Sequence, residues 1–331
     1  MFYSTTVENL CQSVDLDALT PLSDVGRGGR ERPWRAYKMA NETLAVAYDT
    51  VDPRKAERLR QCGKVLTFLE DSAGNKRLQS ADSCRVRLCP LCSWRRSLKN
   101  FWNTMRILQY FTQTGSKYAY IFLTLTVRNC SGDELARKLD DMFAAIQRFT
   151  QRDAVRRAFR GMVRNLEITH NVCKESKDYD TYHPHFHCIV AVMPSYFTSR
   201  DYLSQARLAE LWRDACRVDY DPIIDVRRVK GDDARAVAEC SKYAAKAQDY
   251  IIHEDWPLTI QTVRLLDSAL ANRRLINYSG VFRAAKADLK LEDAETGSLD
   301  DVGALDEVEI GENRRLVSYY WYSGYRQYYK V

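Results

Sequence analysis

The segment at residues 183–192 constrains the fold most, because it places three of the chain's five histidines directly before an apolar, β-branched run. Such a run predicts a buried strand. Successive side chains of a strand point to opposite faces, so His185 and His187 share one face and Phe186 points to the other. Pro184 lacks an amide donor and marks the start of the strand, which puts His183 at its rim. Two imidazoles on one face can share a metal ion, although they can also be plain polar residues of a half-exposed strand.

Neighbouring strands offer a third ligand. A strand is expected at residues 162–170, and Glu167 is a carboxylate within its apolar pattern. A buried carboxylate is unfavourable unless it meets a cation, so we predict Glu167 as the third ligand. His170 is the competing candidate, on the opposite face of that strand. In a further strand at residues 118–127, alternation puts Thr124 and Thr126 on one face.

A second metal site is expected from the cysteines. The chain has ten, unevenly spaced, which favours thiols and metal over a disulfide framework. Cys89-Pro-Leu-Cys92 is typical of a zinc knuckle, Cys84 is a good third ligand and Cys62 brings a single fourth thiol before a strand-like segment at 65–69. The alternative is a set of buried free cysteines. The arginines around the last three favour structural zinc.

A basic helix is expected directly after the cysteines and continues to about residue 111. Its Arg95, Arg96 and Lys99, with Trp94, suit phosphate contact and base stacking, although the aromatic residues can also be a core stripe.

Residues 288–312 hold ten acidic side chains and one lysine, which leaves +15 on the rest of a chain whose formal charge is +6. A polyanion is the natural partner of such a body.

A further helix, expected at residues 234–247, carries Glu239, Tyr243 and Lys246 at spacings that put them on one face, with Lys242 beside them. Taken alone, this set is weak, because such residues usually form a solvated helix face.

Together, three motifs in a fixed order resemble those of the HUH endonucleases: Phe122-Leu-Thr-Leu-Thr126, His185-Phe-His187, and the segment from Glu239 to Lys246. The closest resemblance is to the plasmid rolling-circle replication initiators, the Rep proteins with a single catalytic tyrosine. It covers roughly residues 60–290 and includes the cysteine-rich stretch. It implies an α+β fold, in which a central antiparallel sheet is flanked by helices and joined to a small zinc-binding module.

The resemblance also implies roles. Tyr243 matches the nucleophile, and Glu239 matches the carboxylate that activates water in the terminating step. Lys242 and Lys246 can favour the phenolate, because an ordinary tyrosine with a pKa near 10 is a poor nucleophile at neutral pH. Tyr250 is the alternative nucleophile. The residues that match the ligands of the nuclease metal, Mg²⁺ or Mn²⁺, are His185, His187 and Glu167.

The implied activity is metal-dependent nicking of one strand of origin DNA, single-stranded or in a hairpin, which leaves a 5′-phosphotyrosine link and a 3′-hydroxyl primer. Host helicase and polymerase would be partners. A relaxase or single-strand transposase would use the same chemistry, and a non-catalytic zinc-ribbon DNA-binding protein is the alternative from another class. The sequence has neither an apolar run of membrane-spanning length nor a signal-peptide pattern, so we expect a cytoplasmic protein.

The expected organisation has six parts. These are an N-terminal segment without an assignable role (1–58), the cysteine-rich module with its basic helix (59–112), the nuclease domain (113–257), a helical extension (258–287), a flexible acidic stretch (288–312) and an aromatic C-terminal segment (313–331).

Overall fold

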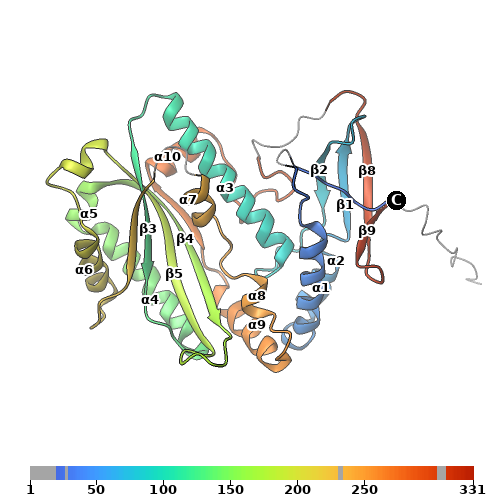
Figure 1. Cartoon of the computed structure of the whole chain (residues 1–331), viewed down its shortest axis with the longest axis horizontal. Coiled ribbons are helices and arrows are strands. Elements are labelled where there is room, and N and C mark those ends of the chain that lie inside the picture. The colour runs from blue at the N-terminus through green and yellow to red at the C-terminus, as the bar shows by residue number, and fades with distance from the viewer. Residues whose placement is uncertain (1–19, 27–28, 230–233, 304–310) are drawn as a thin grey trace, which may run out of the picture.

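The computed structural model describes residues 20–26, 29–229, 234–303 and 311–331. Parts of the expected N-terminal segment (1–19) and acidic stretch (304–310) therefore lie outside the described residues. Two antiparallel sheets with helices around them make up the described chain (Figure 1). The mixed α+β class is thus confirmed.

The larger sheet has five strands in the order β6-β3-β5-β4-β7, and every neighbouring pair is antiparallel. The histidine strand β5 lies at its centre, as expected for a strand that is buried over most of its length. Strands β3, β4 and β5 match the segments expected above from the sequence, and β7 was not anticipated. Their bounds are β3 Ala119–Thr126, β4 Phe159–Asn171, β5 Thr181–Val192, β6 Ile224–Val229 and β7 Ile276–Gly280.

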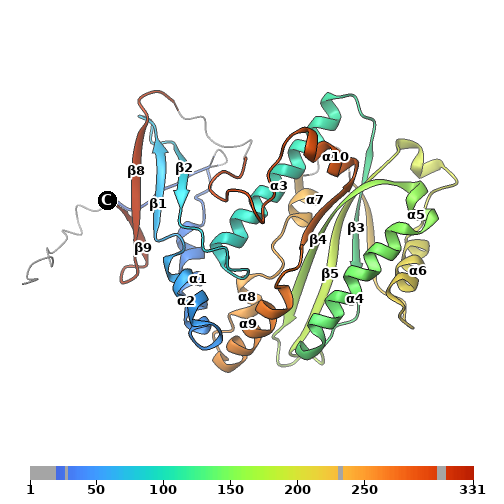
Figure 2. The same cartoon turned by 180° about the vertical axis from the view of Figure 1, so that it is seen from behind.

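Helices cover both faces of this sheet (Figures 1 and 2). On one face, Phe186 of β5 packs against Phe143 of α4 and Trp212 of α6. On the other face, Phe122 belongs to an apolar cluster with residues of α3, α7 and α10. The first set comprises α4 Gly132–Gln151, α5 Asp153–Ala158 and α6 Gln205–Cys216, and the second comprises α3 Pro90–Gln113, α7 Ala234–Cys240 and α10 Val281–Asp288.

The smaller sheet joins segments from the two ends of the chain, in the order β2-β1-β8-β9. Val65 of β1 pairs with Tyr320 of β8, so the cysteine-rich module and the aromatic C-terminal segment form one sheet (Figure 2). Tyr319, Trp321 and Tyr328 are buried there, which explains the aromatic composition of the C-terminus. The strands are β1 Val65–Glu70, β2 Lys76–Ala81, β8 Arg315–Tyr322 and β9 Gln327–Lys330.

The long helix α3 runs between the two sheets (Figure 1). It begins at Pro90, where the fixed φ of proline suits a first helical turn, and the side chain of its N-cap Cys89 accepts from the amide of Cys92. The remaining helices, α1 Trp34–Val51, α2 Pro53–Gln61, α8 Ala247–Tyr250 and α9 Trp256–Leu270, lie around the N-terminal half of α3. Among the described helices, none has the length and apolarity needed to cross a membrane.

The single helix expected at residues 234–247 is wrong. Helix α7 ends at Cys240, α8 begins at Ala247, and the link between them is not helical. In the link, Lys242 O accepts from Asn165 Nδ2 at 2.5 Å, and Ala244 O accepts from the amide of Ile168 at 2.6 Å. Carbonyls that a helix would use internally therefore bond to strand β4, and this tertiary pairing overrides the helical propensity of an alanine-rich segment.

Candidate metal centre and its surroundings

Glu167, His185 and His187 converge on the face of the larger sheet that α3 and α7 cover. Glu167 of β4 lies directly across from His185 of β5 in the strand register, so backbone pairing alone brings the two side chains together. His187 Nε2 lies 2.9 Å from Glu167 Oε2 and 3.1 Å from His185 Nε2. Ligands of one octahedral ion at ~2.1 Å are separated by about 3.0 Å. The three atoms thus have the spacing of a single ion's ligands.

The outer nitrogens of both imidazoles are oriented by neighbours. His185 Nδ1 lies 3.1 Å from the carbonyl of His183, and His187 Nδ1 lies 3.3 Å from Thr124 Oγ1. A carbonyl only accepts, so His185 donates through Nδ1 and turns the Nε2 lone pair inward. Lone pairs and a carboxylate that face one point repel one another unless a cation lies between them. The donor set, two nitrogens and one oxygen, therefore fits a divalent ion.

The electrostatic surroundings keep Glu167 charged. Burial by itself raises the pKa of this carboxyl, but its contacts with His185, His187 and Lys246 outweigh burial and hold the pKa well below its usual range. Lys246 Nζ lies 3.0 Å from Glu167 Oε1, the oxygen that does not face the imidazoles. The site therefore presents an ionised ligand at neutral pH.

The other two histidines of this region lie outside the triad. His170 points to the opposite face, as strand parity predicts, and its Nε2 lies 2.8 Å from Asp180 while its ring stacks on Tyr182. His183 stacks on His185 with ring centroids 5.1 Å apart. Its pKa is lowered by burial and then by His185. His183 therefore orients a ligand from the rim of the site.

The end of α7 and the segment that follows it lie beside the triad. Glu239 Oε1 is 3.6 Å from His187 Nε2 and receives a hydrogen bond of 2.5 Å from Lys242. The expected pairing of lysines with a phenol is thus replaced by pairing with carboxylates, Lys242 with Glu239 and Lys246 with Glu167. The side chain of Tyr243 instead points toward α1, where its hydroxyl lies 3.5 Å from that of Tyr37.

Sequence reasoning missed Tyr37 and Asn165. Asn165 lies two residues before Glu167, so the parity that identified Glu167 also places Asn165 on the same face. No local pattern singles out Tyr37, which lies 206 residues from its partner Tyr243. Tyr250, the alternative nucleophile, is only 1% exposed and donates to Leu88 O at 2.6 Å. Its hydroxyl therefore has a structural partner in the core.

The four predicted zinc ligands meet in one buried cluster, and no ligand atom lies more than 4.8 Å from another. Cys62 Sγ lies 3.5 Å from Cys89 Sγ and 3.6 Å from Cys92 Sγ, and Cys84 Sγ lies 3.8 Å from Cys92 Sγ. Four sulfurs at ~2.3 Å from a tetrahedral zinc ion lie about 3.8 Å apart. The amide of Arg85 also donates to Cys92 Sγ at 3.3 Å, a contact that suits a thiolate. The cluster therefore fits zinc.

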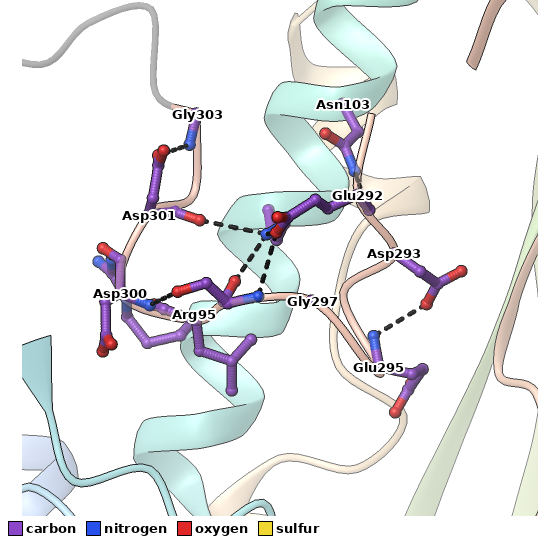
Figure 3. A network of polar contacts seen from close by, with 12 residues as sticks. Arg95, Asn103, Glu292, Asp293, Glu295, Gly297, Asp300, Asp301 and Gly303 are labelled. Atoms are coloured by element: carbon purple, nitrogen blue, oxygen red, sulfur yellow. Dashed lines mark hydrogen bonds and ion pairs between the residues drawn. The ribbon is translucent and has the colours of Figure 1, made fainter. Parts of the chain in front are cut away.

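The four residues expected to contact DNA from α3 are buried, and this corrects their expected exposure. Arg95, Arg96, Lys99 and Trp94 are exposed by 6%, 8%, 4% and 8%. Figure 3 shows the segment that covers Arg95, which belongs to the acidic stretch. Lys99 Nζ lies 2.6 Å from Glu292 and from Ser298 O, and Arg95 donates to Leu299 O and Asp300 O.

Residues 288–303 of the acidic stretch pack against the rest of the described chain. Glu295 accepts two hydrogen bonds of 2.8 Å from Arg87, and Asp293 pairs with Arg274 at 2.6 Å. Leu299 and Val302 are each 2% exposed. The local acidic excess therefore neutralises the basic start of α3 from within the same chain.

Comparison with known proteins identifies the family. Residues 75–330 match the family described as "Replication protein". A relative named "Protein rep" from Bacillus amyloliquefaciens is 35% identical to this chain, and the alignment covers 93% of this chain and 96% of the relative. A relative of the same name from Lentilactobacillus hilgardii is 36% identical, and the alignment covers 91% of this chain and 95% of the relative. Another from Streptococcus pneumoniae is 32% identical, and the alignment covers 90% of this chain and 92% of the relative. No solved structure matches the chain. The chain therefore belongs to the replication protein (Rep) family of plasmid replication initiators, as its motifs predict.

Proposed function

We propose that the chain starts rolling-circle replication by cutting one strand of plasmid origin DNA, with Tyr243 as nucleophile beside the metal centre. The observation that carries the proposal is the convergence of Glu167, His185 and His187 within 4.8 Å of one another on an antiparallel sheet. The link that holds Tyr243 is bonded to the adjacent part of strand β4. Family membership supports the same conclusion, because a replication initiator acts on DNA.

The three ligands would hold Mg²⁺ or Mn²⁺, which draws electron density from a non-bridging oxygen of the scissile phosphate. Tyr243 Oη forms a bond to phosphorus while the bond between phosphorus and the 3′ oxygen breaks. The phenol proton passes to solvent, and the departing 3′ oxygen takes up a proton. The products are a 5′-phosphotyrosine link and a 3′-hydroxyl that a polymerase can extend. The covalent link retains the bond energy, so the strand can be rejoined without a nucleotide cofactor.

Glu239 acts in the terminating step of this proposal. Its carboxylate lies 3.6 Å from His187 and next to the nucleophile's segment, so it can take a proton from a water that attacks a second phosphodiester. Lys242 and Lys246 pair with Glu239 and Glu167, and they place two positive charges where the phosphate enters. One tyrosine and one carboxylate then suffice for two cleavages.

The test is nicking of a supercoiled plasmid that carries the origin, followed by mass spectrometry of the protein–oligonucleotide adduct. Wild-type protein with Mn²⁺ should nick and form an adduct at Tyr243, and Tyr243→Phe should do neither. His187→Ala should bind Mn²⁺ weakly in calorimetry and lose nicking. Tyr325→Phe is the matched control, because Tyr325 is 52% exposed on the turn between β8 and β9.

Two outcomes would redirect the proposal. Metal-dependent nicking by Tyr243→Phe would remove Tyr243 as the nucleophile. Origin binding without any nicking by the wild-type protein would favour a zinc-ribbon DNA-binding protein. A relaxase or single-strand transposase shares the chemistry, so the decisive measurement is plasmid copy number, which should depend on Tyr243 for a replication initiator.

A further inference from the structure

A groove with a volume of about 570 Å³ lies beside the first half of α3, between the chain around Trp34, the strand β2 and helix α7. Aromatic rings line much of it. Trp34 and Trp94 are buried and meet edge to face at 4.8 Å, while Phe101 and Trp102 are partly exposed and meet edge to face at the same distance. The rings of Phe101 and Trp102 therefore offer uncovered surface to another flat ring.

Polar groups in the groove also suit a nucleotide. Arg30 is exposed at its edge, and Arg32 lines it while paired with Asp24 at 2.7 Å. Ser241 lines the groove as well, is 1% exposed, and its buried Oγ has no hydrogen-bond partner among the described residues. A buried hydroxyl without a partner is unfavourable, and a ligand with donors and acceptors can supply the missing hydrogen bond.

The groove is directly connected to the proposed nucleophile. Ser241 precedes Tyr243 by two residues, and Ser97 Oγ of α3 donates to Ser241 O at 2.7 Å. Ser97 lines both this groove and the smaller cavity that Tyr243 lines. In addition, Tyr37, whose hydroxyl meets that of Tyr243, stacks on Trp94 with ring centroids 5.4 Å apart. A strand cut at Tyr243 would thus pass close to these rings.

We propose that this aromatic groove binds an unpaired base of single-stranded DNA next to the scissile phosphate, and the inference rests on the proposed function. The base stacks on Trp102 and Phe101, its edge meets the Ser241 hydroxyl, and Arg30 contacts the sugar–phosphate chain. Stacking on aromatic side chains is how proteins hold unpaired bases, and duplex DNA cannot use it because its bases are already stacked. The groove therefore selects the melted form of the origin.

The experiment measures binding rather than cleavage. Full-length Tyr243→Phe protein is titrated, without added divalent metal, into the single-stranded origin sequence with 2-aminopurine at one position at a time around the nick site. Stacking should quench the fluorescence at one or two positions. Adding Trp102→Ala should abolish that quenching and weaken binding roughly ten- to hundred-fold, whereas Trp102→Phe should keep most of both. Ser241→Ala should weaken binding about five-fold without leaving a large cavity.

Tyr325→Ala, which does not alter the lining of the groove, should bind like the parent protein. Circular dichroism and zinc content check that each variant is folded. Equal affinities of the parent and both Trp102 variants would overturn the proposal and leave the groove to another occupant, such as a peptide segment. Equal losses on single-stranded and duplex DNA would also overturn it, because stacking acts on the former alone. Failure of the nicking chemistry would leave these binding results intact, so the two proposals are tested separately.

Discussion

The hydroxyl of Tyr37, on α1, lies 3.5 Å from the hydroxyl of Tyr243, and the ring of Tyr37 stacks on Trp94 of α3. Burial, followed by the contact with Tyr243, raises the pKa of Tyr37 well above its ordinary value of 10.0. Tyr37 therefore stays protonated across the neutral range and can donate a hydrogen bond to Tyr243. A hydrogen bond donated to the attacking oxygen stabilises negative charge on that oxygen. This gives the N-terminal helix a part in the proposed site.

We expect Tyr37→Phe to slow formation of the covalent DNA adduct about ten-fold at pH 7, because a hydrogen bond to a charged group contributes about 1.5–3 kcal/mol. The rate should recover as the pH rises, because hydroxide in solution can then take the proton from the attacking hydroxyl. Adduct formation in single-turnover reactions between pH 6 and about 10 checks this, with Tyr325→Phe as the control. An unchanged pH profile would contradict the role given to Tyr37.

Glu239→Gln should separate the two proposed cleavages. The amide keeps the size of the side chain but cannot accept a proton, so the first transfer to Tyr243 should proceed within a few-fold of wild type. Cleavage of a second origin strand by water should slow by roughly 10²–10⁴-fold. The measurement is the rate at which the purified adduct cleaves a second, labelled origin strand. Cleavage at the wild-type rate would assign water activation to another group.

Cys89→Ser and Cys92→Ser should each remove about one zinc ion per chain and lower the melting temperature, because the cluster joins α2, the end of β2 and the start of α3. Cys173→Ser is the matched control, since Cys173 is exposed and lies outside the cluster. Metal analysis and thermal melts of the three variants provide the readout. Zinc content that stays the same in all three would show that the four thiols do not bind it.

Lys99→Met should reduce stability more than DNA binding. Lys99 is 4% exposed and bonded to Glu292 and two carbonyls of the acidic segment, so the substitution leaves those acceptors without their partner. We expect a lower melting temperature and an unchanged salt dependence of oligonucleotide affinity. A salt slope reduced by about one would instead show that Lys99 contacts a phosphate.

The lowered pKa of Asp293 predicts that its contacts in the same segment weaken in acid. Burial raises the pKa of this carboxyl, but the amide of Glu295 and the cations Lys286 and Arg274 outweigh burial and lower it below 3.8. A lowered pKa in the folded state means that the contribution to stability is complete above the unfolded pKa and is lost as the pH falls through the folded one. Asp293→Asn should therefore cost about 1 kcal/mol at pH 7, a value discounted for solvent screening, and progressively less below pH ~4. Urea melts across this range test it, with the exposed Asp219→Asn as control.

Much of the candidate site could be predicted because it depends on strand periodicity. Alternation placed His185 and His187 on one face, and the same rule separated Glu167 from His170. The four cysteines were also predictable, because two cysteines separated by two residues, as in Cys89 and Cys92, are typical of a zinc knuckle. Their convergence is a structural finding, and their roles in catalysis and zinc binding stay predictions until the experiments above are done.

The sequence alone determined the three central strands of the larger sheet, the faces of their side chains and the family to which the chain belongs, since these follow from local patterns. Three features were decided only by the tertiary structure. The helix ends at Cys240, and the hydroxyl of Tyr37 contacts that of Tyr243. The acidic residues 288–303 also cover the basic end of α3, which lies some two hundred residues earlier in the chain. Each depends on partners far apart in the chain. Hydrogen bonds to an open strand edge and the pairing of buried charges outweigh the local helical propensity. Periodic patterns in the sequence do not predict such contacts.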